Sequence, residues 1–325
     1  MITAEDLHKS FRTRRKAEVE AVRGISLTVE PGEIFGFLGP NGAGKTTTLR
    51  MLTTLLPIDR GKATVAGFDV MQQPQEVRRR IGYVSQLGGA DELATGRENL
   101  ILQARLYGAG AAEAATRAEQ LTELLDLASF ISRKVITYSG GQRRRLDVAL
   151  GIVHHPDVLF LDEPSTGLDP QNRVNLWDHI RGLRQQGTAV VLTTHYLEEA
   201  DELCDRVTII DSGQIVAEGP PRELKRAVSG DSVLLTLHDG EAGLAQAQLQ
   251  SQPFVRDLTS DGSQLRLYVD DGGTAIPMIL RLLDQKEIGL RSMSLSEPTL
   301  DDVFLRHTGR SLRDAGNPQT QPAAA

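Results

Sequence analysis

The sequence predicts an α/β domain that contains a helical insertion and is followed by a smaller α+β domain. In the first part of the chain, short apolar runs bounded by glycine and proline alternate with helical patterns. Between residues 97 and 127, leucines recur at helical spacing instead. After Gly219-Pro220-Pro221 the order of strands and helices changes again, which indicates a second domain.

Bulk properties narrow the possible classes of protein. The chain has 325 residues, more than one average domain needs. Its net charge of −7 disfavours a nucleic-acid binder, which usually carries a basic face. The single cysteine, Cys204, cannot form an internal disulfide, and this fits a reducing cytosol.

The sequence contains no segment that we expect to enter a membrane. No run of about 18 consecutive apolar residues occurs. The first residues include Glu5 and Asp6, where a signal peptide would carry basic residues. Any membrane-spanning part of the system is therefore expected on another polypeptide.

The α/β part is expected to contain buried strands at the sites of its continuous apolar runs. Such runs are typical of strands covered on both faces of a parallel sheet. The predicted strands are 22–29, 33–38, 81–84, 158–161 and 189–193, and the predicted helices are 45–56 and 171–186. The helical insertion spans about 87–138, with a break marked by Gly108 and Gly110.

The C-terminal part is predicted to follow the order β-α-β-β-α-β, a ferredoxin-like arrangement. Its predicted strands are 233–237, 255–259, 264–269 and 290–295, and its predicted helices are 244–250 and 275–285. Residues 309–325 are polar and are expected to be disordered. These patterns divide the chain into domains at 1–225 and 230–308, followed by the tail.

A phosphate-binding loop is predicted between the strand that ends near Leu38 and the helix that follows. The residues Gly39-Pro40-Asn41-Gly42-Ala43-Gly44-Lys45-Thr46 match the P-loop pattern in the strand–loop–helix context that it requires. Backbone N–H groups in such a loop bind phosphate oxygens at the positive end of the helix. Lys45 would reach the β- and γ-phosphates of ATP, and Thr46 would bind Mg²⁺. A chance glycine-rich turn is the alternative, and the strand–helix context disfavours it.

Two adjacent acids end the apolar run Val158-Leu159-Phe160-Leu161. Asp162, at the end of a buried strand, is suited to hold Mg²⁺. The side chain of Glu163 leaves the backbone in another direction and could polarise an attacking water. Alone, two acids at a strand end could simply meet solvent, but the P-loop favours a catalytic role.

A helix is predicted to begin after Tyr138-Ser139-Gly140-Gly141-Gln142. Ser139 suits an N-cap, because its hydroxyl can accept from amides in the first turn. A purely structural cap is compatible with function, since the same exposed amides can also bind an anion.

The Ser139–Gln142 segment closely resembles the signature of ABC ATPases, and it lies between a P-loop and an Asp-Glu-Pro strand end as in that family. The resemblance covers about residues 1–225 and implies a role for further residues. It implies that Phe11 stacks on adenine, that Thr47 joins the nucleotide contacts, that Gln86 senses Mg²⁺ and the attacking water, that Asp169 contacts a second subunit, and that His195 senses the γ-phosphate. Ser139, Gly140, Gly141 and Gln142 would complete the ATP site of a partner copy.

Two features refine the resemblance. The first residue of the signature is Tyr138, where the family usually has leucine, but the phosphate-facing serine and glycines are intact. The segment 297–305 is similar to the end of ATPases of the daunorubicin-resistance type. This similarity implies an exporter of drugs, polyketides, lipids or glycans.

The resulting prediction is an ATP- and Mg²⁺-dependent ATPase that powers an ABC exporter. The chain has one P-loop and one signature, so the working unit is expected to be a homodimer that holds two ATP molecules. A separate transmembrane permease subunit is the second expected partner, no nucleic acid is expected, and the location is the cytoplasmic face of the membrane, peripherally bound.

Three alternatives remain open for the function. A soluble ABC ATPase acting on nucleic acid or ribosomes usually has tandem cores or a long coiled-coil insertion, for which residues 86–139 leave no room. A non-catalytic regulatory subunit is disfavoured by the intact acidic and basic residues. An importer subunit is disfavoured only by the C-terminal segment.

The sequence also suggests a role for two surface segments, residues 87–99 and the arginine run at 143–145. The segment 87–99, with Leu87 and Leu93, is predicted to form the groove that receives a short helix of the permease; the alternative is that Leu93 packs inside the helical insertion. The run Arg143-Arg144-Arg145 could bind phosphate or lipid, but a solvated helix face is the preferred interpretation.

Overall fold

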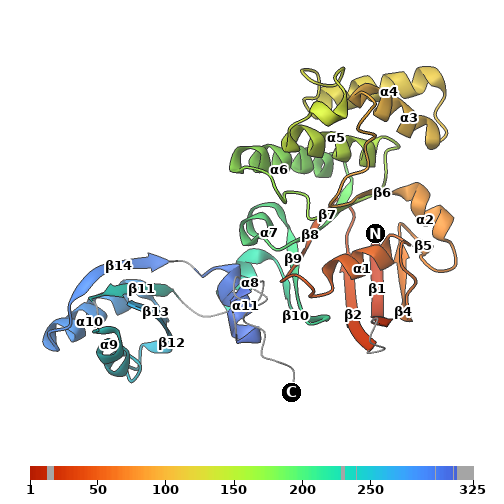
Figure 1. Cartoon of the computed structure of the whole chain (residues 1–325). Coiled ribbons are helices and arrows are strands. Elements are labelled where there is room, and N and C mark those ends of the chain that lie inside the picture. Colours follow the sequence, from red (N-terminus) through yellow and green to blue (C-terminus); the bar gives the residue numbers. More distant parts are fainter. Residues whose placement is uncertain (13–17, 228–230, 239, 297, 310, 313–325) are drawn as a thin grey trace. The chain divides into compact units, whose positions relative to one another are not determined.

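The computed structural model describes residues 1–12, 18–227, 231–238, 240–296, 298–309 and 311–312. These residues form two compact units, 1–220 and 221–311 (Figure 1). Most of the tail predicted to be disordered, 309–325, lies outside the described residues. Within the described part of the chain, no helix is both long enough and apolar enough to cross a bilayer.

An antiparallel sheet opens the first unit. Its strand order is β2-β1-β4-β5. The strands are β1 (Ile2–Arg12), β2 (Glu18–Val29), β4 (Arg60–Val65) and β5 (Phe68–Asp69). The sequence prediction gave no bounds for β1, because its apolar residues alternate with charged ones and only one face is buried.

A six-stranded sheet carries the residues predicted to be functional. Its order is β10-β9-β3-β8-β7-β6, and all neighbours are parallel except β10 and β9. The strands are β3 (Ile34–Leu38), β6 (Ile81–Val84), β7 (Val158–Asp162), β8 (Ala189–Thr194), β9 (Arg206–Asp211) and β10 (Gln214–Gly219). Strands β3, β7 and β8 are buried along their whole length, as their continuous apolar runs predict.

The helices of the first unit fall into two groups. Those within the α/β core are α1 (Lys45–Leu52), α2 (Pro74–Arg80), α6 (Pro170–Gln185) and α7 (Leu197–Leu203). The helical part contains α3 (Gly96–Leu106), α4 (Ala111–Leu124) and a short 3₁₀ turn at Val135–Thr137 within the predicted insertion, and α5 (Gly140–Ile152), which begins just after its predicted end at 138. Helix α3 packs on both α4 and α5. One apolar core joins α1 to both sheets, and within it Phe35 and Phe37 meet edge to face at 5.4 Å.

The second unit has the predicted ferredoxin-like order of elements. Its antiparallel sheet runs β12-β13-β11-β14. The elements are α8 (Pro221–Ala227), β11 (Ser232–Leu237), α9 (Ala242–Leu249), β12 (Val255–Asp261), β13 (Gln264–Val269), α10 (Gly272–Gln285), β14 (Leu290–Ser296) and α11 (Leu300–Thr308). Helices α9 and α10 share an apolar core with one face of this sheet. The α/β core with a helical insertion and the small α+β part are thus confirmed.

Candidate functional site

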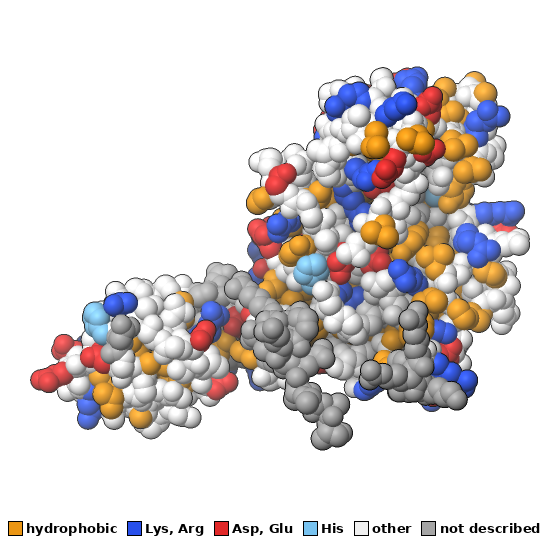
Figure 2. Space-filling model, viewed as in Figure 1, with side chains coloured by type: hydrophobic (Ala, Val, Ile, Leu, Met, Phe, Trp, Pro, Cys, Tyr) orange, Lys and Arg blue, Asp and Glu red, His pale blue; other side chains and the backbone are white. Residues whose placement is uncertain are grey.

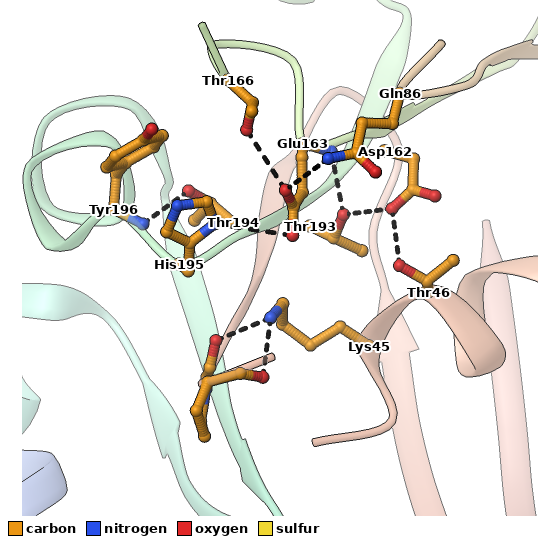
Figure 3. Close-up of polar contacts among 12 residues, drawn as sticks. Lys45, Thr46, Gln86, Asp162, Glu163, Thr166, Thr193, Thr194, His195 and Tyr196 are labelled. Carbon is orange, nitrogen blue, oxygen red and sulfur yellow. Dashed lines mark hydrogen bonds and ion pairs between the residues drawn. The ribbon is translucent and has the colours of Figure 1, made fainter. Parts of the chain in front are cut away.

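The predicted phosphate loop connects the end of β3 to the start of α1. Lys45, the first residue of α1, is only 4% exposed. Its Nζ donates hydrogen bonds to the carbonyl oxygens of Gly39 at 2.6 Å and Pro40 at 3.0 Å (Figure 3). Burial lowers the pKa of Lys45, although the acids Glu163 and Asp162 act in the opposite direction. The lysine therefore lies inside the loop, a buried cation held by two main-chain carbonyls.

Asp162, at the end of β7, connects three elements. Its Oδ1 accepts hydrogen bonds from Thr46 Oγ1 on α1 at 2.9 Å and from Thr193 Oγ1 on β8 at 2.6 Å (Figure 3). The parallel register sets Asp162 beside Thr193, and Asp162 is only 3% exposed. A hydroxyl and a carboxylate oxygen thus lie together beside the phosphate loop, and these are donors that Mg²⁺ prefers.

Glu163 turns away from the strand that precedes it. Its φ angle of 47° lies in the left-handed region, which is uncommon for a residue other than glycine. Its N–H donates to the main-chain oxygen of Thr193 at 3.1 Å and to Thr193 Oγ1 at 3.0 Å. These bonds hold the turn, so the two adjacent acids point in different directions.

Three side chains meet the carboxylate of Glu163 (Figure 3). Oε2 accepts from Gln86 Nε2 at 3.1 Å and from Thr166 Oγ1 at 3.2 Å. His195 Nδ1 lies 3.5 Å from Oε1, a distance long for a hydrogen bond. His195 is the main cause of the lowered pKa of Glu163. An ionised carboxylate beside an amide and an imidazole suits a general base for water.

The predicted signature forms a helix cap at the start of α5. Ser139 Oγ accepts from the Gln142 N–H at 3.3 Å, and Gln142 Oε1 accepts from the Ser139 N–H at 3.1 Å. This reciprocal pair is a capping box. It uses the amides of Ser139 and Gln142, so the amides of Gly140 and Gly141 in the first turn take no part in it. Figure 1 shows helices α5 and α1 in different parts of the first unit.

Asp169 caps α6 next to the signature. Its Oδ1 accepts from the Asn172 N–H at 2.9 Å, and this bond is the main cause of its lowered pKa. A Cβ atom at Gly141 would approach within 2.5 Å of Asn172 Oδ1, so the starts of α5 and α6 adjoin. The two residues predicted to contact a second subunit, Ser139 and Asp169, therefore lie on neighbouring helix starts.

Tyr138 occupies the position where a leucine is usual, and the structure accommodates its larger side chain. Its OH donates to the Phe130 carbonyl oxygen at 2.9 Å, and the two rings meet edge to face at 4.9 Å. A Cβ atom at Gly96 would collide with the Tyr138 hydroxyl. The ring packs within the helical insertion and leaves the serine cap intact.

Phe11 is placed on β1 with its ring 40% exposed. Lys9 Nζ lies 5.8 Å from the centre of that ring. In the described part of the chain, no hydrogen bond or ring contact links Phe11 to the phosphate loop. Its role toward adenine stays a prediction.

The expectation of a solvated face for the arginine run is wrong for Arg144. Arg144 is 7% exposed and donates to three main-chain oxygens. Arg145 donates to the Asp126 carbonyl oxygen at 3.1 Å and lies 5.1 Å from the centre of the Phe130 ring. Only Arg143, paired with the exposed Glu92 at 2.5 Å, fits the expectation.

The sequence analysis also missed two hydroxyl residues of the site, Thr166 and Thr193. Thr193 could have been found, because adjacent parallel strands end together and this threonine follows the apolar run of β8. Thr166 lies in a loop, and no local sequence pattern indicates that its side chain turns toward Glu163.

A groove of about 220 Å³ lies beside the Gln86 loop. It is lined by residues of β6, the loop, α3 and α5, which are Tyr83, Val84, Ser85, Gly88, Gly89, Gln103, Tyr107, Asp147, Leu150 and Gly151. Two exposed leucines adjoin lining residues along the chain: Leu87, next to Gly88, is 93% exposed, and Leu106, next to Tyr107, is 73% exposed. Figure 2 shows hydrophobic side chains on the surface of the part that carries α3 and α4. Leu93, 71% exposed, does not pack inside the insertion; like Leu87 and Leu106, it is exposed but is not among the lining residues.

Comparison with known proteins assigns both units. A family model described as "ABC transporter" matches residues 22–166, and one described as "ATP-binding protein DrrA1-3-like, C-terminal domain" matches residues 219–308. The daunorubicin resistance ATP-binding protein DrrA2 of Streptomyces coeruleorubidus is 44% identical, over 91% of this chain and 92% of that protein. The Nod factor export ATP-binding protein I of Burkholderia thailandensis is 42% identical, over 90% and 93%.

Solved structures resemble the first unit. The dimeric structure of a bacterial ABC transporter cassette matches with a TM-score of 0.63 and 25% identity, covering 68% of this chain and 98% of that one. A dimeric post-hydrolysis cassette bound to ADP and Pi has the same fold, with a TM-score of 0.63 and 23% identity.

Proposed function

The chain belongs to the family of ABC transporter ATP-binding proteins, and from that premise we propose how its own residues bind ATP and Mg²⁺, hydrolyse the nucleotide and drive an exporter. The observation that carries the proposal is the convergence at the end of β7. There Asp162 bonds to Thr46, while Glu163 bonds to Gln86 and lies against His195.

Phosphate and metal binding are assigned to two adjacent groups of atoms. Lys45 exchanges its two carbonyl contacts for the β- and γ-phosphates, because a buried ammonium gains more from phosphate oxygens than from neutral carbonyls. Thr46, Asp162 and Gln86 hold Mg²⁺ through their oxygen atoms. The Thr46–Asp162 contact supports this assignment, since it already joins two suitable donors beside the loop.

Hydrolysis is assigned to Glu163, with Gln86 and His195 as its neighbours. The lowered pKa of Glu163 keeps its carboxylate ionised, and an ionised carboxylate can polarise the attacking water and accept its proton. Gln86 orients that water, and His195 donates to the γ-phosphate. Phe11 is proposed to stack on adenine.

A homodimer completes each ATP site. The chain has one P-loop and one signature, and α5, which the signature begins, lies in another part of the first unit than α1 in Figure 1. We therefore place Ser139, Gly140, Gly141 and Gln142 of one copy against the ATP of the other, with Asp169 at the same interface.

The membrane subunit is proposed to insert a short helix into the groove beside the Gln86 loop. A helix laid in a groove depends on a few apolar anchors, which Leu87, Leu106 and Tyr107 can supply. This assignment moves the centre of the docking surface from Leu93 toward α3. The protein then lies peripherally on the cytoplasmic face of the membrane.

The cargo is proposed to be a drug, polyketide, lipid or glycan. The names of the relatives, one for daunorubicin resistance and one for Nod factor export, support export of such molecules. The ATP-binding domain is assigned to residues 1–225 and the accessory domain to 230–308. The family matches at 22–166 and 219–308 support that division.

Measurement of ATPase activity with the Lys45→Ala variant tests the proposal. Removal of the ammonium should greatly weaken nucleotide binding or turnover, while the purified wild type hydrolyses ATP only with Mg²⁺ present. Lys62→Ala is the matched control, because Lys62 is an exposed surface lysine paired with Glu5 at 2.9 Å. A Lys45→Ala protein that binds and hydrolyses ATP normally would remove the P-loop assignment.

A further inference from the structure

Helix α5 buries two opposite charges on one face. Arg144 is 7% exposed and Asp147 is 5% exposed, and residues three apart lie on the same side of a helix. Buried charges are costly unless each is paired or hydrogen-bonded. The contacts of these two side chains therefore indicate what they hold.

The guanidinium of Arg144 contacts the main chain around the catalytic residues. Nη1 donates to the Ser85 carbonyl oxygen at 2.7 Å, immediately before Gln86. Nε donates to the Pro164 oxygen at 2.8 Å and Nη2 to the Asp162 oxygen at 3.2 Å, on either side of Glu163. Only the planar, five-donor fork of arginine can serve three acceptors in this way.

Asp147 holds the other end of the same loop. Its Oδ1 accepts from the Gly89 N–H at 3.1 Å. A Cβ atom at Gly88, where φ is 77°, would lie 2.6 Å from Asp147 Oδ2, so the loop passes directly over the carboxylate. The start of the loop is thus fixed by Arg144 and its end by Asp147.

We propose that Arg144 and Asp147 are positioning residues that fix the Gln86 loop to helix α5 and hold Gln86 against Glu163. The proposal rests on the proposed roles of Gln86 and Glu163. Ser139 caps the same helix, so a shift of α5 at the partner's ATP reaches the chain's own Gln86 and Glu163. Leu87, between the two fixed ends of the loop, is 93% exposed and lies where a docked helix can push on it.

The test compares steady-state ATP hydrolysis by Arg144→Lys, Asp147→Ala and the double variant. Arg143→Lys is the control, because Arg143 lies on the same helix but pairs at the surface with Glu92. Each single change should lower kcat about tenfold or more, while the KM for ATP stays within about threefold, since Lys45 and the phosphate loop are untouched. Asp147→Asn, which keeps the acceptor for Gly89, should recover most of the activity.

The double variant distinguishes a shared loop from two separate effects. Because either single change already frees the same loop, the double variant should be no more than about twofold slower than the slower single variant. The emission of Trp177, the only tryptophan of the chain, checks folding, because its buried ring donates to Glu199 Oε1 at 3.1 Å.

Three results would overturn the proposal. The first is a kcat for the single variants that lies within about twofold of the Arg143→Lys control. The second is a loss in the double variant that equals the product of the two single losses in kcat. The third is a loss in activity accompanied by a rise in KM and a shift of the Trp177 emission. An inactive wild type would instead overturn the proposed function. An active wild type with unaffected Arg144 and Asp147 variants would overturn this inference alone.

Discussion

The side-chain amide of Gln86 donates a hydrogen bond to Glu163 Oε2 over 3.1 Å, although the two residues are 77 positions apart in the chain. Gln86 follows β6 and Glu163 follows β7, which are parallel neighbours in the sheet. The end of β7 presents the acid, and the loop after β6 presents the amide. Hydrolysis is therefore expected to be sensitive to the charge at position 163 more than to its shape.

Replacement of Glu163 by glutamine should preserve ATP binding and stop most turnover. The amide keeps the size of the side chain but cannot take a proton from water, and general bases typically contribute about 10²–10⁴-fold. The ATP that remains bound should hold two copies together, which size-exclusion chromatography would show as a stable dimer. Unchanged turnover would exclude Glu163 as the base.

Complementation between two inactive variants should reveal sites shared by two copies. Ser139→Arg damages the signature, and Lys45→Ala damages the phosphate loop. In their mixed dimer both changes fall on one site and leave the other intact, so ATPase activity should partly return. Proven mixed dimers without any recovery would count against shared sites, unless the two sites are obligatorily coupled. Each variant alone is the control.

Charge introduced on the proposed docking surface should uncouple ATPase from export. Leu106→Asp and Leu93→Asp place an acid where an apolar anchor is expected, and burial of an unpaired charge is costly. The Leu106→Asp change, on α3, should weaken co-purification with the permease more than the Leu93→Asp change does. Basal ATPase of the isolated chain should not change.

Leu55→Asp is the control for that experiment, because Leu55 is 51% exposed but lies after α1, outside the residues that line the groove. Normal export by the Leu106→Asp protein would exclude the groove as the docking surface. Lost basal ATPase with a lower melting temperature would show that the change damages the fold instead.

Stability should fall on acidification, partly because of His154. Its Nε2 donates to the Ile81 carbonyl oxygen at 2.9 Å, whereas its buried Nδ1 meets no hydrogen-bond partner among the described residues. Burial lowers its pKa from 6.5 to about 4. Between these values the unfolded chain binds a proton that the folded chain does not, so the free energy of unfolding decreases as the pH falls from about 6.5 to 4.

The His154→Gln variant should lose less stability than the wild type between pH 7 and pH 5. Glutamine can still donate to Ile81 but does not titrate. Since His154 is partly exposed, the difference is expected to be on the order of 1–2 kcal/mol. Urea unfolding at both pH values measures it, and equal losses in the two proteins would show that His154 does not titrate as stated.

The fold could be predicted mainly where one local signal dominates. Val158–Asp162 and Ala189–Thr194 are continuous apolar runs, which are typical of parallel strands covered on both faces. Lys45 and Asp162 belong to motifs with defined neighbours along the chain. The edge strand β10 has no fully buried residue, so its sequence carries no comparable signal.

Contacts that depend on distant backbone could not be predicted. Arg144 stands between Arg143 and Arg145, and composition alone treats the three as equivalent. Helical rotation turns Arg144 toward the carbonyl oxygens of Ser85, Asp162 and Pro164, which lie on other elements. A charge run therefore indicated a solvated face, although one member is buried and donates three hydrogen bonds.

Because Tyr138 packs against Gly96, the residue at position 138 restricts which residues fit at position 96. The hydroxyl of Tyr138 occupies the space that any side chain at position 96 would need. A leucine at 138 would remove the hydroxyl but not the side chain of Ile131, whose Cδ1 would lie 2.8 Å from a Cβ atom at position 96. A side chain at position 96 would therefore require both the Tyr138 hydroxyl and the Ile131 side chain to move.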